Sequence, residues 1–172
     1  MDTMRKIICS LFTLAALCAQ AVASGSSPFL PSAQLVGQGQ FTRFGFSVYE
    51  ARLWAPLGRY SLSEPFALSL TYSREIAGER LVQASFDEMQ KLQAPITQNT
   101  QWREALERVL PNVVPGDTIT GVYQPGQGAT FFHRERQTGQ ISDDLARYFF
   151  AIWLDPRTSE PSLRQALLGT KR

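Results

Sequence analysis

The sequence has 172 residues, of which 44% are hydrophobic, and its 17 Lys and Arg nearly balance its 15 Asp and Glu. This length is typical of a single domain with a core of ordinary size. A formal net charge of +2, with no run of basic side chains that could follow phosphates, argues against nucleic acid as a partner.

The first residues have the composition of a targeting segment. Arg5 and Lys6 precede an apolar run at residues 7–19, and an Ala-x-Ala cleavage signal follows at residues 21–23. The run ends at Gln20, short of the roughly 20 apolar residues that a membrane-spanning helix needs. We therefore predict a cleaved signal peptide at residues 1–23 and a secreted protein.

Both cysteines, Cys9 and Cys18, lie inside this predicted signal peptide. The mature chain would thus have no thiol for a disulfide or for cysteine catalysis. A lipoprotein anchor at Cys18 is the weaker alternative, because bulky Leu17 precedes it. Residues 24–32 are small, polar and proline-containing, which predicts a flexible leader before one domain at residues 33–172.

Two segments show the alternation of a half-buried strand. In residues 44–54, Phe44, Phe46 and Val48 fall on one side, whereas Tyr49 falls on the other. The pattern repeats in FALSLTY, residues 66–72. The apolar side of each strand is expected to face a core.

The apolar spacing then changes to three and four residues, which predicts helices over residues 78–93 and 102–110. Pro95 and Pro111 end them. Both helices are expected to cover a sheet.

Residues 117–124 and 129–134 read as a hairpin near the sheet centre, because Pro-Gly-Gln-Gly lies between them. Ser142 is a predicted N-cap for a strongly apolar helix that runs through Trp153 and ends at Asp155-Pro156. A last short helix is expected between Pro161 and Gly169. Strands and helices grouped in this way predict an α+β fold with an antiparallel sheet covered by helices.

Motifs for cofactor or metal chemistry are weak. Gly37 and Gly39 do not form a dinucleotide loop, since position 42 is Thr and no helix follows, so they predict a bulge or a close backbone approach. His133 is the only histidine and has no cysteine or second histidine as a partner. Asp143 and Asp144 are adjacent and read as helix-start residues. We expect neither a metal nor a cofactor.

Two further carboxylates are assigned structural roles. Asp117 follows Pro-Gly and is expected to accept backbone hydrogen bonds in its own turn. Asp155 precedes a proline and is expected to accept turn N–H groups or to pair with Arg157 or Arg164.

A few arginines and tyrosines within apolar runs are candidates for ligand binding, because a guanidinium at the edge of an apolar cleft would suit a carboxylate. For each of them the alternative is a side chain that only covers the sheet or fills its rim. The candidates are Arg43, Tyr49, Tyr72, Arg74 and Arg147.

Several motifs together resemble those of chalcone-isomerase-like proteins secreted by bacteria. They are the Gly37/Gly39 pair, VYEARLW at residues 48–54, PGD at 115–117 and AIWL at 151–154. The resemblance runs from about Leu35 to Gly169 and implies an open-faced β-sandwich, a ligand cleft between sheet and helices, and a periplasmic location.

The resemblance also implies which polar groups a plant-type isomerase would need. Its substrate-polarising arginine corresponds here to Phe41, its tyrosine to Leu81, and its helix threonine falls near Arg147. Loss of such donors costs on the order of 3 kcal/mol of transition-state stabilisation each. Arg43, two residues past Phe41 on the same strand face, is the one replacement that the sequence offers.

We therefore expect a non-catalytic periplasmic protein that binds a fatty acid or another hydrophobic small molecule. Two alternatives stay open. One is an isomerase or lyase with relocated polar residues, such as Arg43, Tyr49 or Tyr72. The other is a module that docks an envelope protein and fills its own cleft with Phe41, Phe44 and Trp54.

Overall fold

The computed structural model describes residues 27–95 and 100–170, and the predicted signal peptide lies outside them. Within these residues, six antiparallel strands form one sheet in the order β1-β2-β3-β4-β5-β6, so each strand pairs with its sequence neighbours. The strands are β1 (Ala33–Arg43), β2 (Phe46–Pro56), β3 (Phe66–Tyr72), β4 (Thr118–Gln124), β5 (Gly128–His133) and β6 (Arg136–Ile141). The helices are α1 (Gly78–Lys91), α2 (Thr100–Val109), α3 (Asp143–Leu154) and α4 (Pro161–Leu167).

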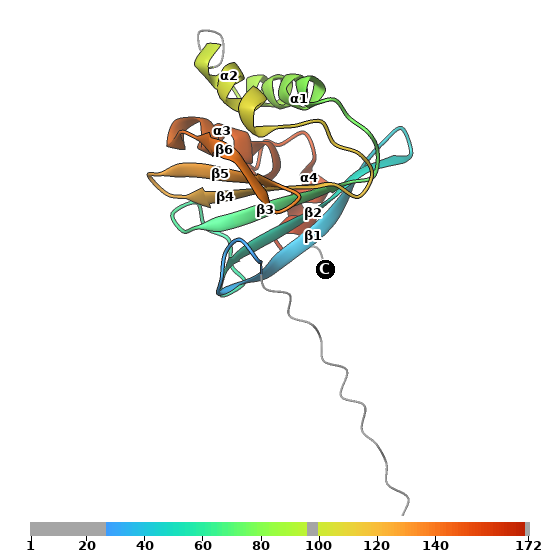
Figure 1. Ribbon diagram of the computed structural model, residues 1–172. Helices are drawn as coiled ribbons and strands as arrows, with labels where there is room; N and C mark the ends of the chain where they lie inside the picture. Colours follow the sequence, from blue (N-terminus) through green and yellow to red (C-terminus); the bar gives the residue numbers. More distant parts are fainter. Residues whose placement is uncertain (1–26, 96–99, 171–172) are drawn as a thin grey trace, which may run out of the picture.

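The helices pack on the sheet at different places: α3 contacts β5, α2 contacts β6 and α4 contacts β1 (Figure 1). On β3 the inward side chains Leu68, Leu70 and Tyr72 are all buried, as the alternation predicts. The core between sheet and helices is aromatic where α3 lies, since Phe150 packs edge-on against Phe66 at 4.9 Å. This arrangement is the predicted α+β fold with an antiparallel sheet covered by helices.

The predicted close approach at Gly37 and Gly39 is confirmed. A Cβ on Gly37 would lie 2.2 Å from the backbone oxygen of Ala166 in α4, and one on Gly39 would lie 2.8 Å from Leu163. The β1–β2 register also shifts between Leu35 and Gly37, as a bulge requires. Glycine thus lets α4 lie directly on the edge strand.

One strand prediction is wrong, and one strand was missed. Phe44 and Phe46 do not face the core, because they are 87% and 64% exposed at the turn between β1 and β2. The side of β2 that is buried carries Ala51 and Leu53 instead. β6 was not predicted at all, since its sequence RQTGQI is polar and lacks an apolar alternation.

The opposite face of the sheet is more polar. Ser69 and Thr120 are joined by a hydrogen bond of 2.9 Å across β3 and β4, and Thr71 and Thr118 are joined by another of 2.9 Å. In the described part of the predicted leader, residues 27–32, Phe29 stacks on Phe132 of β5 at 4.5 Å and Ser27 is buried, whereas Pro28, Pro31 and Ser32 are exposed.

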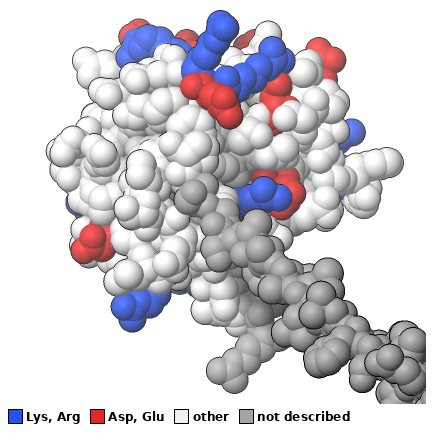
Figure 2. All heavy atoms as spheres, turned by 60° about the horizontal axis from the view of Figure 1, so that its bottom comes forward, with Lys and Arg blue, Asp and Glu red and all other residues white. Residues whose placement is uncertain are grey.

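Figure 2 shows a surface on which charged side chains are sparse and gather mainly at the upper edge, where both signs mix. Among the described residues, none of the helices is both long and apolar enough to cross a bilayer.

Candidate functional site

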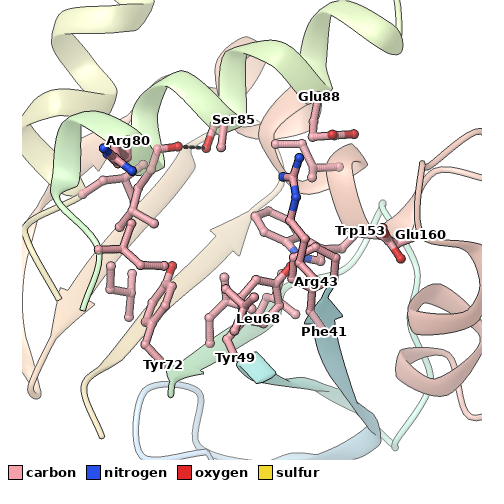
Figure 3. Close-up of a pocket in the computed structure, with 18 of the residues that line it drawn as sticks. Phe41, Arg43, Tyr49, Leu68, Tyr72, Arg80, Ser85, Glu88, Trp153 and Glu160 are labelled. Atoms are coloured by element: carbon pink, nitrogen blue, oxygen red, sulfur yellow. Dashed lines mark hydrogen bonds between the residues drawn. The ribbon is translucent and has the colours of Figure 1, made fainter. Parts of the chain in front are cut away.

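A cleft of about 1160 Å³ lies between the sheet, α1, α3 and the segment at residues 158–160. Its volume is somewhat above the roughly 300–1,000 Å³ that is usual for small-molecule sites. The sheet supplies its floor, which includes Phe41, Tyr49, Leu68, Leu70, Tyr72, Ile119 and Phe131. The helices supply its roof, which includes Leu81, Ser85, Phe149, Ile152 and Trp153 (Figure 3).

Two tyrosines form the polar part of the floor. Tyr49 on β2 and Tyr72 on β3 are register partners, and their rings meet edge to face at 5.8 Å. Phe41 on β1 stacks on the other side of Tyr49 at 5.1 Å. On the roof, the Trp153 indole N–H donates a hydrogen bond of 3.0 Å to the Tyr49 hydroxyl.

Both phenols are held in the neutral form. Burial raises the pKa of Tyr49 above its usual value, although the Trp153 hydrogen bond opposes this. Burial also raises the pKa of Tyr72, and the neighbouring Tyr49 adds to the effect. Each side chain therefore keeps its O–H proton throughout the physiological range and is able to donate it.

Neither phenol has an acceptor for that proton among the described residues. Tyr49 accepts a hydrogen bond from Trp153, which leaves its own proton free. Tyr72 is only 5% exposed, and Figure 3 shows its hydroxyl pointing into the cleft. Neither hydroxyl oxygen is among the described buried atoms that lack a hydrogen-bond partner, so both groups open into the cleft, where a ligand or water can accept their protons.

Cationic side chains lie around the cleft. Arg43, Arg74 and Arg80 line it, and none of the three makes an ion pair within the described residues. Figure 3 shows the Arg43 guanidinium extending from the sheet side toward Glu88 on α1. These three guanidinium groups are available to an anionic ligand at the cleft.

Glu88 is occupied by other partners. Burial raises the pKa of its carboxyl, but hydrogen bonds from Lys91 at 2.7 Å and Ser159 at 2.6 Å, together with the Arg43 charge, outweigh it and lower the pKa. Glu88 is therefore ionised at neutral pH and is a poor general base, since an efficient base has a pKa near the working pH.

The structure brings four of the five predicted ligand-binding residues together: Arg43, Tyr49, Tyr72 and Arg74 all line the cleft. Arg147 does not, because its guanidinium pairs with Asp143 at 2.9 Å one helical turn earlier. Asp143 also accepts hydrogen bonds from the Tyr123 hydroxyl and the Gly126 backbone. Arg147 therefore belongs to a cluster at the start of α3.

The positions that correspond to the plant isomerase residues are apolar and lie in the cleft. Phe41 and Leu81 both line it. Two other residues were not predicted as site residues. Arg80 directly precedes Leu81 on α1, and Trp153 lies in the predicted apolar helix, but no sequence pattern marked either of them as a ligand-binding residue.

The other ionisable groups singled out in the sequence serve the fold. Asp117 accepts from the Val114 backbone at 3.0 Å and from Arg134 at 2.6 and 3.0 Å, as its predicted turn role requires. His133 Nε2 lies 3.1 Å from the same carboxylate. Asp155 accepts from the backbone and side chain of Arg157, also as predicted. Residues 27–95 and 100–170 contain no group of three His, Cys, Asp or Glu side chains that could hold a metal ion.

The comparisons with known proteins agree with this architecture. A solved fatty-acid binding protein of Arabidopsis thaliana is similar in structure, with a TM-score of 0.65 over 80% of this chain and 87% of the other, at 14% sequence identity. No curated protein matches the chain in sequence. A family model described as chalcone isomerase-like matches residues 31–169, so the chain belongs to the chalcone isomerase-like family.

Proposed function

We propose that this protein binds a hydrophobic molecule with an anionic head group, most simply a fatty acid, and that it does so without catalysis in the periplasm. The observation that carries the proposal is the pair of phenol hydroxyls, Tyr49 and Tyr72, whose protons have no acceptor among the described residues. The fatty-acid binding protein that shares the fold supports the same ligand class.

The cleft matches an acyl chain with a carboxylate at one end. Its apolar walls would withdraw the chain from water, at roughly 0.8 kcal/mol for each buried methylene. A carboxylate has only acceptor atoms, so it complements two neutral phenol donors. Hydrogen bonds to a charged group contribute about 1.5–3 kcal/mol each, which is more than those to a neutral one.

Catalysis is disfavoured by the groups that line the cleft. The raised pKa values of Tyr49 and Tyr72 make both phenols poor proton acceptors at neutral pH. The positions of the plant isomerase's arginine and tyrosine are occupied by Phe41 and Leu81, which cannot stabilise a developing oxyanion. The site is thus suited to holding an acid in its ground state.

The test is fatty-acid binding by residues 24–172, which contain every element that the structure describes. Isothermal titration with saturated acids of increasing length should show binding, and Tyr72→Phe should weaken it by about tenfold, because one donor to a charged acceptor is lost. Tyr60→Phe is the matched control, since Tyr60 packs on Phe66 and does not line the cleft. No binding by the unaltered protein would overturn the proposal.

One observation favours a second function, that of an isomerase acting on an α,β-unsaturated ketone. Arg43 lines the cleft and could replace the missing arginine at Phe41. Turnover of such an enone that is lost in Arg43→Ala but kept in Arg52→Ala would establish it. Arg52 is the control because it pairs with Glu50 at 2.9 Å and does not line the cleft.

The open cleft argues against the alternative of a protein-docking module that fills its cleft with its own side chains. Phe41 lines an open cleft, and Phe44 points away from the core with 87% of its surface exposed. The periplasmic location in our proposal rests on the sequence of residues 1–23. Osmotic-shock fractionation of the expressed full-length chain would test it, and retention in the cytoplasm would contradict it.

A further inference from the structure

The turn that joins β1 to β2 presents an aromatic ring in an unfavourable backbone conformation. Arg43 pairs with Phe46, so the turn consists of Phe44 and Gly45, with φ angles of +52° and +80°. Two-residue turns of this kind favour Asn, Asp or Gly at both positions, because a larger L side chain is crowded at positive φ. A bulky side chain in such a conformation is a reason to look for a function.

The rings at this turn contribute little to the fold. Phe44 is 87% exposed, and Phe46, which opens β2, is 64% exposed. Each ring is paired with a cation instead, since the Arg43 guanidinium lies 5.5 Å from the Phe44 centroid and that of Arg74 lies 5.9 Å from Phe46. The result is a projecting hairpin tip with two water-exposed aromatic rings, each beside a guanidinium.

This tip is also part of the cleft. Arg43 and Phe44 of the tip line the cleft, and so does Arg74, whose guanidinium lies beside Phe46. In Figure 1 the β1–β2 turn projects beyond the end of the sheet. Whatever the tip touches is therefore brought next to the entrance of the proposed binding cleft.

We propose that the β1–β2 tip inserts into the surface of an anionic phospholipid bilayer and thereby places the cleft entrance against the membrane. Aromatic rings settle at the headgroup level of a bilayer, while arginine side chains reach its phosphates. Cations near an anionic surface add a modest attraction that salt screens.

A lipid surface suits this tip better than a protein partner. A stable protein interface needs about 800 Å² on each side, whereas the tip offers two rings on one narrow hairpin. Shallow insertion requires only a small apolar contact with cations around it. The cleft walls carry the cations Arg80 and Lys91 but also the carboxylates of Glu75, Glu88 and Glu160. Because these charges partly cancel, we expect a moderate preference for anionic lipid.

Docking of this kind is independent of the ligand but would serve its exchange. A water-insoluble acid leaving the bilayer beside Phe44 could enter the cleft without crossing bulk water. The docking proposal stands even if the cleft takes another class of ligand, because it rests only on the exposed rings and their cations.

The experiment is co-sedimentation of residues 24–172 with vesicles of phosphatidylcholine, with and without 30% phosphatidylglycerol, at low and high salt. We expect binding to the anionic vesicles that weakens at high salt. Phe44→Asn should reduce it by about tenfold, the effect of no longer burying one aromatic ring. The Asn variant suits the turn, so circular dichroism should show an intact fold.

The matched control is Leu57→Asn. Leu57 is also exposed, at 72%, and also has positive φ, at +56°, but it follows the opposite end of β2. Binding that is unchanged by Phe44→Asn, or lost equally in Leu57→Asn, would overturn the proposal. Sedimentation of the unaltered protein with neither kind of vesicle would also overturn the proposal, and it would favour a protein as the partner of the tip.

Discussion

The indole N–H of Trp153 on α3 donates a hydrogen bond of 3.0 Å to the hydroxyl of Tyr49 on β2, across the cleft between helices and sheet. The two residues are 104 positions apart in the chain. This bond fixes Tyr49 as an acceptor toward the roof, so that its own proton is available to a molecule in the cleft.

We expect this bond to stabilise the cleft measurably. Tyr49→Phe and Trp153→Phe should each lower the free energy of unfolding, and the double-mutant cycle should give a coupling energy of about 1 kcal/mol. Urea titration of the four proteins measures it. The pair Tyr72 and Trp153 is a control, because no hydrogen bond joins them, and its coupling should be smaller. Equal coupling in both cycles would contradict the assignment.

A second prediction concerns the close contact between α4 and β1. Gly37→Ala should lower the free energy of unfolding by about 1–3 kcal/mol, because the new Cβ would meet the rigid Ala166 backbone oxygen and force α4 to move. Gly45→Asn is the control, since its Cβ position is open and Asn tolerates positive φ. A Gly37→Ala protein as stable as the original would show that α4 does not pack so closely.

Local signals explain why much of the helix layer could be predicted. For α3, the Ser142 hydroxyl accepts from the Leu145 backbone at 3.5 Å, and Asp155-Pro156 follows the last turn. Together with the apolar spacing between them, these signals predict a helix for this segment. The two glycines of β1 were also correctly assigned to a close approach, since a Cβ at either position would collide with α4.

The missed strand β6 depends on a distant contact. Its turn consists of Arg134 and Glu135, with φ angles of +48° and +65°, where a hairpin signal would need Asn or Gly. Arg134 is held by two hydrogen bonds to Asp117, which lies 17 positions earlier. No local rule reads such a contact from sequence.

The site was predicted only in part. Tyr49 and Tyr72 were candidates because they lie within apolar runs, but the expected alternation placed Tyr49 on the side away from the core, whereas the structure places it in the cleft as the register partner of Tyr72. The prediction for Arg147 ignored Asp143 four residues earlier, a spacing at which opposite charges pair on a helix. Phe44 and Phe46 were assigned inward because alternation cannot say where a strand leaves the core.

The Asp117 cluster predicts acid sensitivity. Hydrogen bonds from Arg134 and the Val114 backbone hold the pKa of this carboxyl well below its usual range, although burial opposes them. Because the folded pKa is the lower one, the stabilisation is complete above the unfolded value of about 4 and is lost as the pH falls below it. The difference in stability between the protein and Asp117→Asn should thus shrink as the pH falls from 5 toward 3.

Urea titrations at these pH values measure that difference. Asp87→Asn is the control, because Asp87 is an exposed carboxylate on α1 whose hydrogen-bond partner is the neutral Gln83 side chain. Its effect should be small at every pH. A difference for Asp117→Asn that stays the same down to pH 3 would show that the ionised carboxylate is not what holds the turn.

The β1–β2 turn predicts a substitution that improves stability. Phe44→Asn should raise the free energy of unfolding by about 0.5–1 kcal/mol, because Asn tolerates positive φ and only a weak exposed cation–π contact with Arg43 is lost. Phe46→Asn should give no gain, since Phe46 is a strand residue and Asn disfavours strands. The midpoint in urea at unchanged slope is the measure. A gain with Phe44→Asn alongside weaker vesicle binding would mean that the ring is kept at the tip at the expense of the fold, whereas a loss of stability would mean that the ring packs where the structure shows it exposed.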